Sequence, residues 1–196
     1  MASLHDAALQ VFSALDRLRI RYAVGGSFAS SFHGIARATQ DLDVVVELTE
    51  EGARELFQAV APDFYADEKT MLDAIRRGMS FNLIHLESGH KFDLFVAGRH
   101  PLGGEQLAHR KLVKTAMLGG DPLEIHLVSA EDIVLVKLLG YRAGGDVSER
   151  QWNDLVNLAA VQRDRADYPY LETQALRLGV ADLLDRLWSS SRDSAG

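Results

Sequence analysis

The sequence contains no cysteine. This absence excludes disulfide bonds, thiolate metal sites and thiol nucleophiles from any account of the fold or the chemistry. A chain that folds without disulfides is typical of a reducing compartment, so we expect a cytoplasmic protein.

Long hydrophobic runs are also missing. A helix that spans a bilayer needs about 20 consecutive apolar residues, and no run in the sequence approaches that length. The first residues, MASLHDAALQVF, lack the basic segment and apolar core of a secretory signal. We therefore expect neither membrane insertion nor export.

Basic residues are fewer than acidic ones: 21 Lys and Arg against 28 Asp and Glu give a formal net charge of -7. The molecule as a whole therefore repels polyanions, although a local basic patch can still bind one. A small or cationic substrate, or a protein partner, is easier to accommodate. The 47% hydrophobic and 25% charged residues are typical of a globular protein with a substantial core.

Hydrophobic periodicity predicts alternating helices and strands in the first two thirds of the chain. We expect glycine-containing turns to join the strands of two hairpins, and Ser27 to cap a short helix. The predicted elements are a helix over 4–19, a strand over 21–26, a short helix over 27–35, a strand buried on both sides over 42–48, a helix over 49–61, a strand fragment and a helix within 63–78, and hairpins over 80–98 and 109–129.

Strand patterns end near Val128, and the remaining residues have apolar positions at helical intervals. The interpretation is an α/β domain over 1–128, a helical domain over 129–190 and a flexible tail over 191–196. The 196 residues suit one compact domain with an appendage, or two small domains.

Two carboxylates, Asp41 and Asp43, stand one residue apart at the start of an apolar strand. Side chains two apart on a strand project from the same face, so the two charges repel at close range and a cation is expected nearby. A third acid, Asp93, lies within a strand whose flanking residues Phe92 and Leu94 point to the opposite face.

A glycine-rich corner, Gly25-Gly26-Ser27, follows the first predicted strand and precedes a predicted helix. Glycines allow close backbone approach, and a helix N-terminus presents free N–H groups, so this corner can hold a phosphate. One or two Mg²⁺ ions between the acids and nucleotide phosphates would satisfy all these groups together.

Each feature also has a purely structural explanation. The glycines can form only a tight turn, Asp41 and Asp43 can be solvated at a strand end, and Asp93 can pair with Lys91 or an arginine. Their occurrence together, in this order, favours a single site.

The chain resembles the nucleotidyltransferase superfamily with the polymerase-beta-like catalytic fold. The resemblance rests on Val24 followed by Gly25-Gly26-Ser27, on Asp41-Leu42-Asp43 fifteen positions after Gly26, and on the later Asp93. The stretch GGSFASSFHGIARATQDLD, with EDIVLVKLLGYRAG and WNDLVNL, is most similar to small bacterial members of abortive-infection and toxin-antitoxin type.

The resemblance implies an α/β (α+β) fold, with a mixed-sheet nucleotidyltransferase core and a C-terminal helical domain. It implies two bound Mg²⁺ ions, with Mn²⁺ as a possible substitute. The implied site residues are Asp41, Asp43 and Asp93 for metal binding and catalysis, with Asp93 helping to deprotonate the incoming hydroxyl, and Gly25, Gly26, Ser27, Arg37, Thr39 and Lys137 for nucleotide binding.

The implied reaction transfers a nucleoside monophosphate from an NTP to a hydroxyl of a protein, a tRNA or a small molecule, with a cognate antitoxin as a possible partner. Two alternatives stay open. One is an inactive nucleotide-binding or antitoxin-like partner protein, and the other is a phosphohydrolase or structural metal protein. The sequence leaves the acceptor, the preferred base and the oligomeric state open.

Overall fold

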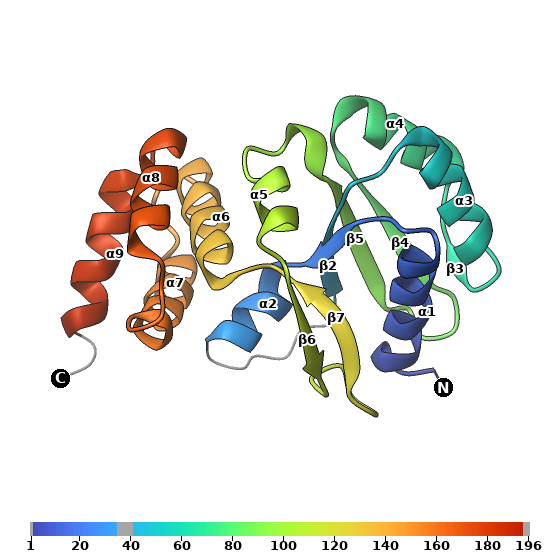
Figure 1. Cartoon of the computed structure of the whole chain (residues 1–196), viewed down its shortest axis with the longest axis horizontal. Helices are drawn as coiled ribbons and strands as arrows, with labels where there is room; N and C mark the ends of the chain where they lie inside the picture. The colour runs from blue at the N-terminus through green and yellow to red at the C-terminus, as the bar shows by residue number, and fades with distance from the viewer. Residues whose placement is uncertain (1, 35–40, 194–196) are drawn as a thin grey trace. The chain divides into compact units, whose positions relative to one another are not determined.

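The computed structural model of the protein describes residues 2–34 and 41–193, which form a mixed sheet with helices around it and a group of helices near the C-terminus (Figure 1). The first part contains α1 (Leu4–Arg17), β1 (Tyr22–Val24), α2 (Gly26–His33), β2 (Asp41–Val46), α3 (Glu50–Val60), β3 (Phe64–Tyr65), α4 (Glu68–Arg77), β4 (Ser80–His85), β5 (Lys91–Val96), the 3-10 helix η1 (Ala97–Arg99), α5 (Gly103–Ala108), β6 (Lys111–Thr115) and β7 (Leu123–Leu127). The later helices are α6 (Ala130–Ala143), α7 (Glu149–Gln162), α8 (Tyr168–Leu178) and α9 (Ala181–Asp193).

The chain divides into two compact units. The first unit comprises residues 1–28 and 38–128, and the second comprises residues 29–37 and 129–196. The chain passes from one unit to the other within α2, between Phe28 and Ala29, and again after Val128. The end of the strand patterns had predicted a boundary near Val128.

The sheet of the first unit has seven strands in the order β3-β4-β5-β2-β1-β7-β6. β2 runs parallel to β5, and β1 runs parallel to β7, whereas the other neighbouring strands are antiparallel. The predicted mixed-sheet α/β fold is therefore confirmed, as are the two hairpins, β4-β5 and β6-β7.

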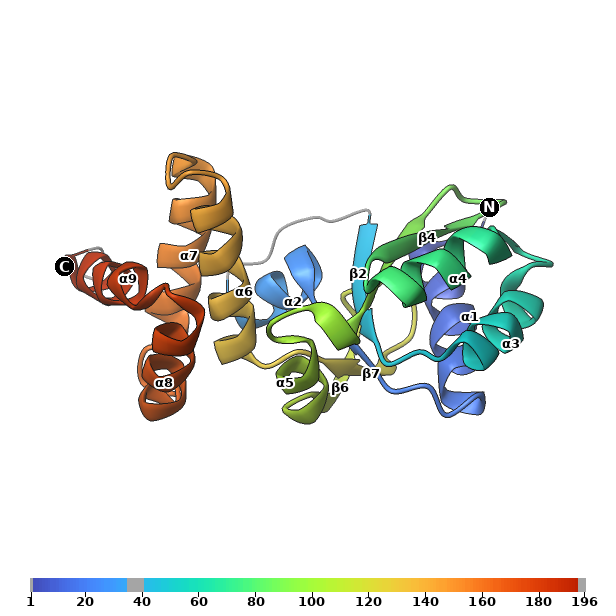
Figure 2. The ribbon, with the colours of Figure 1, turned by 90° about the horizontal axis from the view of Figure 1, so that it is seen from above.

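One face of this sheet is apolar and closely packed. Leu42, Phe92 and Leu94 on this face are fully buried. Phe12 of α1 stacks on Tyr22 at 5.2 Å between ring centroids and meets Phe92 edge-on at 6.4 Å. Helices α1, α3 and α4 lie on this side of the sheet (Figure 2). Burial of these rings and aliphatic side chains supplies much of the first unit's stability.

The opposite face is polar at its centre, because the side chains of β2 and β5 alternate. In β5, Phe92, Leu94 and Val96 are buried, whereas Lys91 and Asp93 are only partly buried. The prediction that the strand over 42–48 is buried on both sides holds for Val44–Val46 but is wrong at Asp43, which is only partly buried, and at Glu47, which is exposed. Asp41, just before that range, is exposed as well. The start of β2 thus presents charged groups on the open face of the sheet.

Most predicted helix ends are confirmed by their capping groups. The Thr49 hydroxyl accepts a hydrogen bond from the Gly52 N–H at the start of α3, and Gly78 ends α4 in the left-handed conformation with φ 63°. The short helix expected over 27–35 is present as α2, but the prediction that Ser27 caps it was wrong. The helix begins at Gly26, so Ser27 lies within its first turn.

Three other features differ from the sequence-based expectations. The residues between β5 and β6 form η1 and α5, two short helices with no strong periodicity to reveal them. The connection between β6 and β7 covers 116–122, so it is longer than the short glycine-containing turn expected there. Helix α9 continues to Asp193, and Ser191 is buried, so 191–193 are helical although the sequence assigned them to the tail.

The second unit is built from amphipathic helices. Leu155, Leu158, Leu171 and Leu184 are fully or almost fully buried between them. Ser129 caps α6 by accepting a hydrogen bond from the Asp132 N–H. None of the helices in the described ranges is long and apolar enough to cross a membrane.

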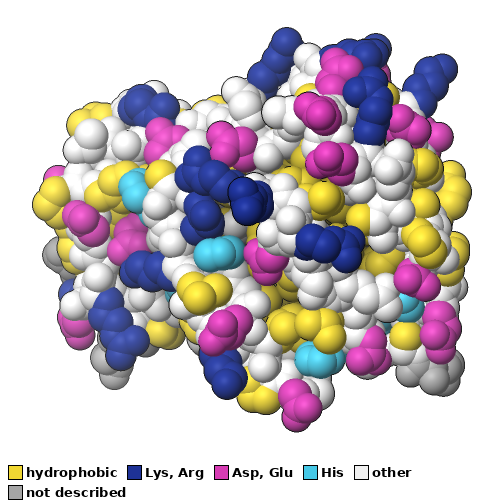
Figure 3. All heavy atoms as spheres, turned by 45° about the vertical axis from the view of Figure 1, so that its right-hand side comes forward, with side chains coloured by type: hydrophobic (Ala, Val, Ile, Leu, Met, Phe, Trp, Pro, Cys, Tyr) yellow, Lys and Arg dark blue, Asp and Glu magenta, His cyan; other side chains and the backbone are white. Residues whose placement is uncertain are grey.

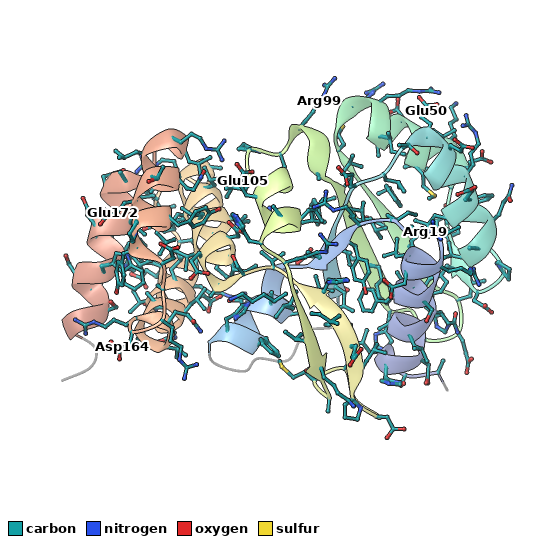
Figure 4. The ribbon with its side chains drawn as sticks, viewed as in Figure 1. Arg19, Glu50, Arg99, Glu105, Asp164 and Glu172 are labelled. Carbon is teal, nitrogen blue, oxygen red and sulfur yellow. The ribbon has the colours of Figure 1, made fainter. Side chains whose placement is uncertain are left out.

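Surface ion pairs tie neighbouring helices of the first unit together. Glu50 of α3, labelled in Figure 4, accepts hydrogen bonds from the Arg76 guanidinium of α4 at 2.8 and 3.0 Å. Because both side chains are well exposed, water screens their attraction and the pair contributes little to stability. The helices are held mainly by the apolar residues beneath them.

Candidate active site

The three predicted acids come together on the polar face of the sheet. β2 and β5 are parallel neighbours, and their register places Asp43 beside Asp93 and Asp41 beside Lys91. Residues that are paired across neighbouring strands project from the same face. The structure therefore brings Asp41, Asp43 and Asp93 into one patch, which we call the acid patch.

Lys91 supplies a positive charge inside the acid patch. Its Nζ lies 2.9 Å from Oδ2 of Asp93 and 3.6 Å from Oδ2 of Asp41. The hydrogen bond to Asp93 raises the pKa of Lys91, and the negative charges of Asp93 and Asp41 act in the same direction. From the sequence, Lys91 was expected only as a structural partner of Asp93, and that pairing is present.

Asp43 is a partly buried acid of the patch. Burial raises the pKa of its carboxyl group because the charged form loses hydration, and the neighbouring Asp93 raises it further. A hydrogen bond from the Ser27 N–H and the charge of Lys91 act in the opposite direction. A carboxylate in this position gains more from a nearby cation than an exposed one does.

The glycine corner meets the acid patch at Asp43. The Gly25 N–H donates a hydrogen bond to the backbone carbonyl of Asp43 at 2.8 Å, and the Ser27 N–H donates to its carboxylate. Gly26 has φ +55°, and a Cβ added there would lie 1.7 Å from Oδ2 of Asp43. Only glycine fits this position, because it lacks a Cβ and tolerates the left-handed backbone.

The first turn of α2 thus begins directly beside an acidic side chain. Its N–H groups have no partners within the helix, and the positive end of the helix dipole attracts negative groups. The sequence predicted that Gly25, Gly26 and Ser27 bind phosphate and that Asp43 binds metal. The structure places the two groups next to each other.

The chemistry of the donor set fits Mg²⁺ or Mn²⁺, which prefer carboxylate oxygens. The Lys91 ammonium already lies against two of the three acids, so the patch accommodates a cation. Within 2–34 and 41–193, no three acidic, histidine or cysteine side chains are already arranged as a metal-binding group. Metal binding by Asp93 and Asp41 would compete with their ion pairs to Lys91.

Two other predicted residues, Arg37 and Thr39, lie outside the residues that the structure describes. Lys137 is half-buried on α6 in the second unit. The nucleotide-binding roles of all three stay predictions.

Asn82 is a polar neighbour of the acid patch that was not among the residues predicted from the sequence. Its position on β4 pairs with Asp93 on β5, and its side chain is exposed on the same face. The alternation of SFNLIH within the first hairpin is the signal that could have placed it there.

Comparison with known proteins identifies the fold but no family. No family model matches the sequence, and no curated protein matches it. Among solved structures, an antigenic nucleotidyltransferase-like protein from Paracoccidioides brasiliensis is similar over 93% of this chain and 91% of its own, with a TM-score of 0.54 and 18% identity. The chain therefore has a nucleotidyltransferase fold.

Two further solved structures have lower TM-scores. The antibiotic-resistance factor ANT(2'')-Ia aligns with 96% of this chain and 95% of its own, with a TM-score of 0.48 and 12% identity. The lincosamide antibiotic adenylyltransferase LnuA aligns with 79% of this chain and 95% of its own, with a TM-score of 0.45 and 13% identity.

Proposed function

We propose that the protein is a nucleotidyltransferase that uses Mg²⁺ to move a nucleoside monophosphate from an NTP to an acceptor hydroxyl. One observation carries the proposal. Asp43 lies beside Asp93 on two parallel strands, and the glycine corner at the start of α2 lies directly against Asp43. The nucleotidyltransferase fold supports it.

Each part of this arrangement has a role in such a transfer. Asp41, Asp43 and Asp93 would hold one or two divalent ions, which supply charge neutralisation for the triphosphate when bound. Gly26 and Ser27 would bind phosphate oxygens, and Asp93 would accept the proton of the attacking hydroxyl. The hydroxyl oxygen would form the new bond to the α-phosphorus as the bond to pyrophosphate breaks, and pyrophosphate would leave. Catalysis would come from positioning and electrostatics, without a covalent protein nucleophile.

The acceptor is proposed only as a class: a protein, a tRNA or a small molecule that carries a hydroxyl group. The net charge of -7 disfavours long polyanions, and Figure 3 shows acidic and basic side chains interspersed over the face that it presents. A cytoplasmic role as part of a toxin-antitoxin or abortive-infection system, with a cognate antitoxin as partner, stays part of the proposal.

A second function is favoured by the ion pairs of Lys91. A lysine that already neutralises two of the acids is compatible with a protein that binds nucleotide without turning it over. This protein would bind a triphosphate but leave it intact, whereas a structural metal protein would bind the ion and ignore the nucleotide.

The test compares wild type, Asp43→Asn and Asp73→Asn with α-labelled NTPs, Mg²⁺ and pools of protein, RNA and small-molecule acceptors. Asp73 is an exposed acid of α4 that pairs with Arg77 and serves as the control. We expect transfer by wild type and Asp73→Asn, and a loss on the order of a hundredfold or more in Asp43→Asn, because electrostatic groups of this kind contribute that much to rate. Addition of EDTA should abolish the transfer.

If wild type and Asp43→Asn are equally inert in every pool, transfer is excluded under these conditions. Calorimetric titration with ATP, GTP, CTP and UTP, with and without Mg²⁺, then separates the alternatives. Triphosphate binding without turnover supports the nucleotide-binding protein, and metal binding alone supports a structural metal protein.

A further inference from the structure

The charge balance of the acid patch depends on Lys91. Its ammonium contacts Asp93 and Asp41, and the side chains of Lys91, Asp93 and Asp41 are 33%, 18% and 56% exposed. Lys91 is itself a residue of β5, two positions before Asp93, so the same strand supplies both a predicted metal ligand and the cation that neutralises it. This pairing is built into the strand register rather than into a mobile loop.

A divalent ion and the Lys91 ammonium compete for the negative charge of the same carboxylates. Oδ2 of Asp93 accepts a hydrogen bond from Nζ at 2.9 Å, so part of its acceptor capacity and charge is already engaged by the lysine. Binding of a free ion therefore weakens an existing ion pair and brings two cations close together. Both effects weaken the binding of metal alone.

The balance changes when the metal arrives with a triphosphate. An ammonium has three N–H donors and needs acceptors for them. Phosphate oxygens supply such acceptors next to the acids, and the long lysine stem lets the charged head move while Cα stays in β5. The displaced ammonium then gains a partner instead of losing one.

We propose that Lys91 is a positioning residue that acts as a resident counter-ion: it occupies the acid patch in the free protein, is displaced by a metal–triphosphate, and thereby makes the patch selective for that complex over free metal. The inference rests on the proposed function, since it assumes that the acid patch binds divalent ions.

The experiment measures two affinities by calorimetry, one for Mn²⁺ alone and one for preformed Mn²⁺–tripolyphosphate, which avoids any choice of base. The proteins are wild type, Lys91→Met, Lys91→Arg and Lys114→Met. Lys114 lies on β6, four strands away from β5 in the sheet order, so its substitution removes the same charge from another place. Urea unfolding verifies that each variant is folded.

For Lys91→Met we expect Mn²⁺ alone to bind about fivefold to tenfold more tightly, the size of effect that one partly buried ion pair produces. Binding of Mn²⁺–tripolyphosphate should be unchanged or weaker, because the displaced ammonium no longer contacts phosphate. Lys91→Arg should still bind Mn²⁺–tripolyphosphate more tightly than Mn²⁺ alone, as wild type does. Lys114→Met should match wild type in both affinities.

A gain in affinity for Mn²⁺ alone, without a gain for the complex, separates this role from a merely structural one, which would weaken both affinities together. The inference is overturned if wild type binds Mn²⁺ and Lys91→Met binds it with equal or lower affinity. If wild type binds neither Mn²⁺ nor the complex, the proposed function itself fails, so the two failures are distinguishable.

Discussion

At the scale of single residues, the acid patch depends on the missing side chain of Gly26. The carboxylate of Asp43 occupies the space into which a Cβ would project, and the backbone at this point is left-handed. The same closeness lets the Ser27 N–H donate to that carboxylate. A glycine here therefore fixes both the start of α2 and the position of the central acid.

Gly26→Ala should damage the site and the fold together. A left-handed alanine costs about 1–2 kcal/mol, and the new methyl group must push Asp43 out of its place. We expect a lower urea midpoint and a loss of NTP-dependent transfer comparable to that of Asp43→Asn. The control is Gly98→Ala, whose Cβ would meet nothing within 4 Å. Wild-type transfer by Gly26→Ala would show that the close approach of α2 to Asp43 is not needed.

At the scale of elements, the sequence predicted the parts of the site that have strong local signals. The acids follow from period-2 alternation: Asp93 between Phe92 and Leu94 could only face away from the core. The glycine corner follows from the limited set of residues that allow a sharp strand-to-helix turn. Because both signals depend on local backbone geometry, they can be read without knowledge of the rest of the fold.

What the sequence could not predict depends on pairing between distant strands. The register that sets Asp43 beside Asp93 and Asp41 beside Lys91 joins segments about fifty positions apart, and no local pattern specifies it. The contacts of Lys91 with two acids follow only from that register. Helix α5 was missed for a different reason, since Gly103 and Gly104 are poor helix formers.

Helix α6 offers a test of how local backbone preference contributes to stability. Gly140 lies inside this helix, is exposed, and has open space where a Cβ would project. Gly140→Ala should therefore stabilise the protein by about 0.5–1 kcal/mol, because alanine loses less backbone entropy in a helix than glycine does. The measurement is urea unfolding followed by tryptophan fluorescence.

The matched control is Gly179→Ala, at the end of α8. Space is equally open there, but φ is +70°, so alanine should be destabilising by about 1 kcal/mol. The same substitution is thus expected to change stability in opposite directions at two positions. A stabilising effect at both would mean that backbone conformation at Gly179 differs from the left-handed one described.

At the scale of the whole molecule, helix α2 belongs to both units. Its residues Gly26, Ser27 and Phe28 are grouped with the sheet, and its remaining residues are grouped with the later helices. Within the second unit, the Gln162 side chain donates a hydrogen bond to the carbonyl of His33, near the end of α2. Neither unit can therefore unfold completely while α2 stays intact, and we expect the two units to unfold together.

Leu94→Ala tests this coupling, because both tryptophans, Trp152 and Trp188, lie in the second unit while Leu94 is fully buried in the sheet of the first. Loss of this buried side chain should cost about 2–5 kcal/mol. If the units unfold together, the urea midpoint seen by tryptophan fluorescence falls by the same amount as that seen by far-UV circular dichroism. Leu176→Ala, at an exposed position of α8, should change neither midpoint appreciably. The contrary outcome is a fluorescence midpoint that stays at the wild-type value while circular dichroism shows loss of structure at lower urea. The second unit would then stay folded without the sheet, and α2 would not couple the unfolding of the two units.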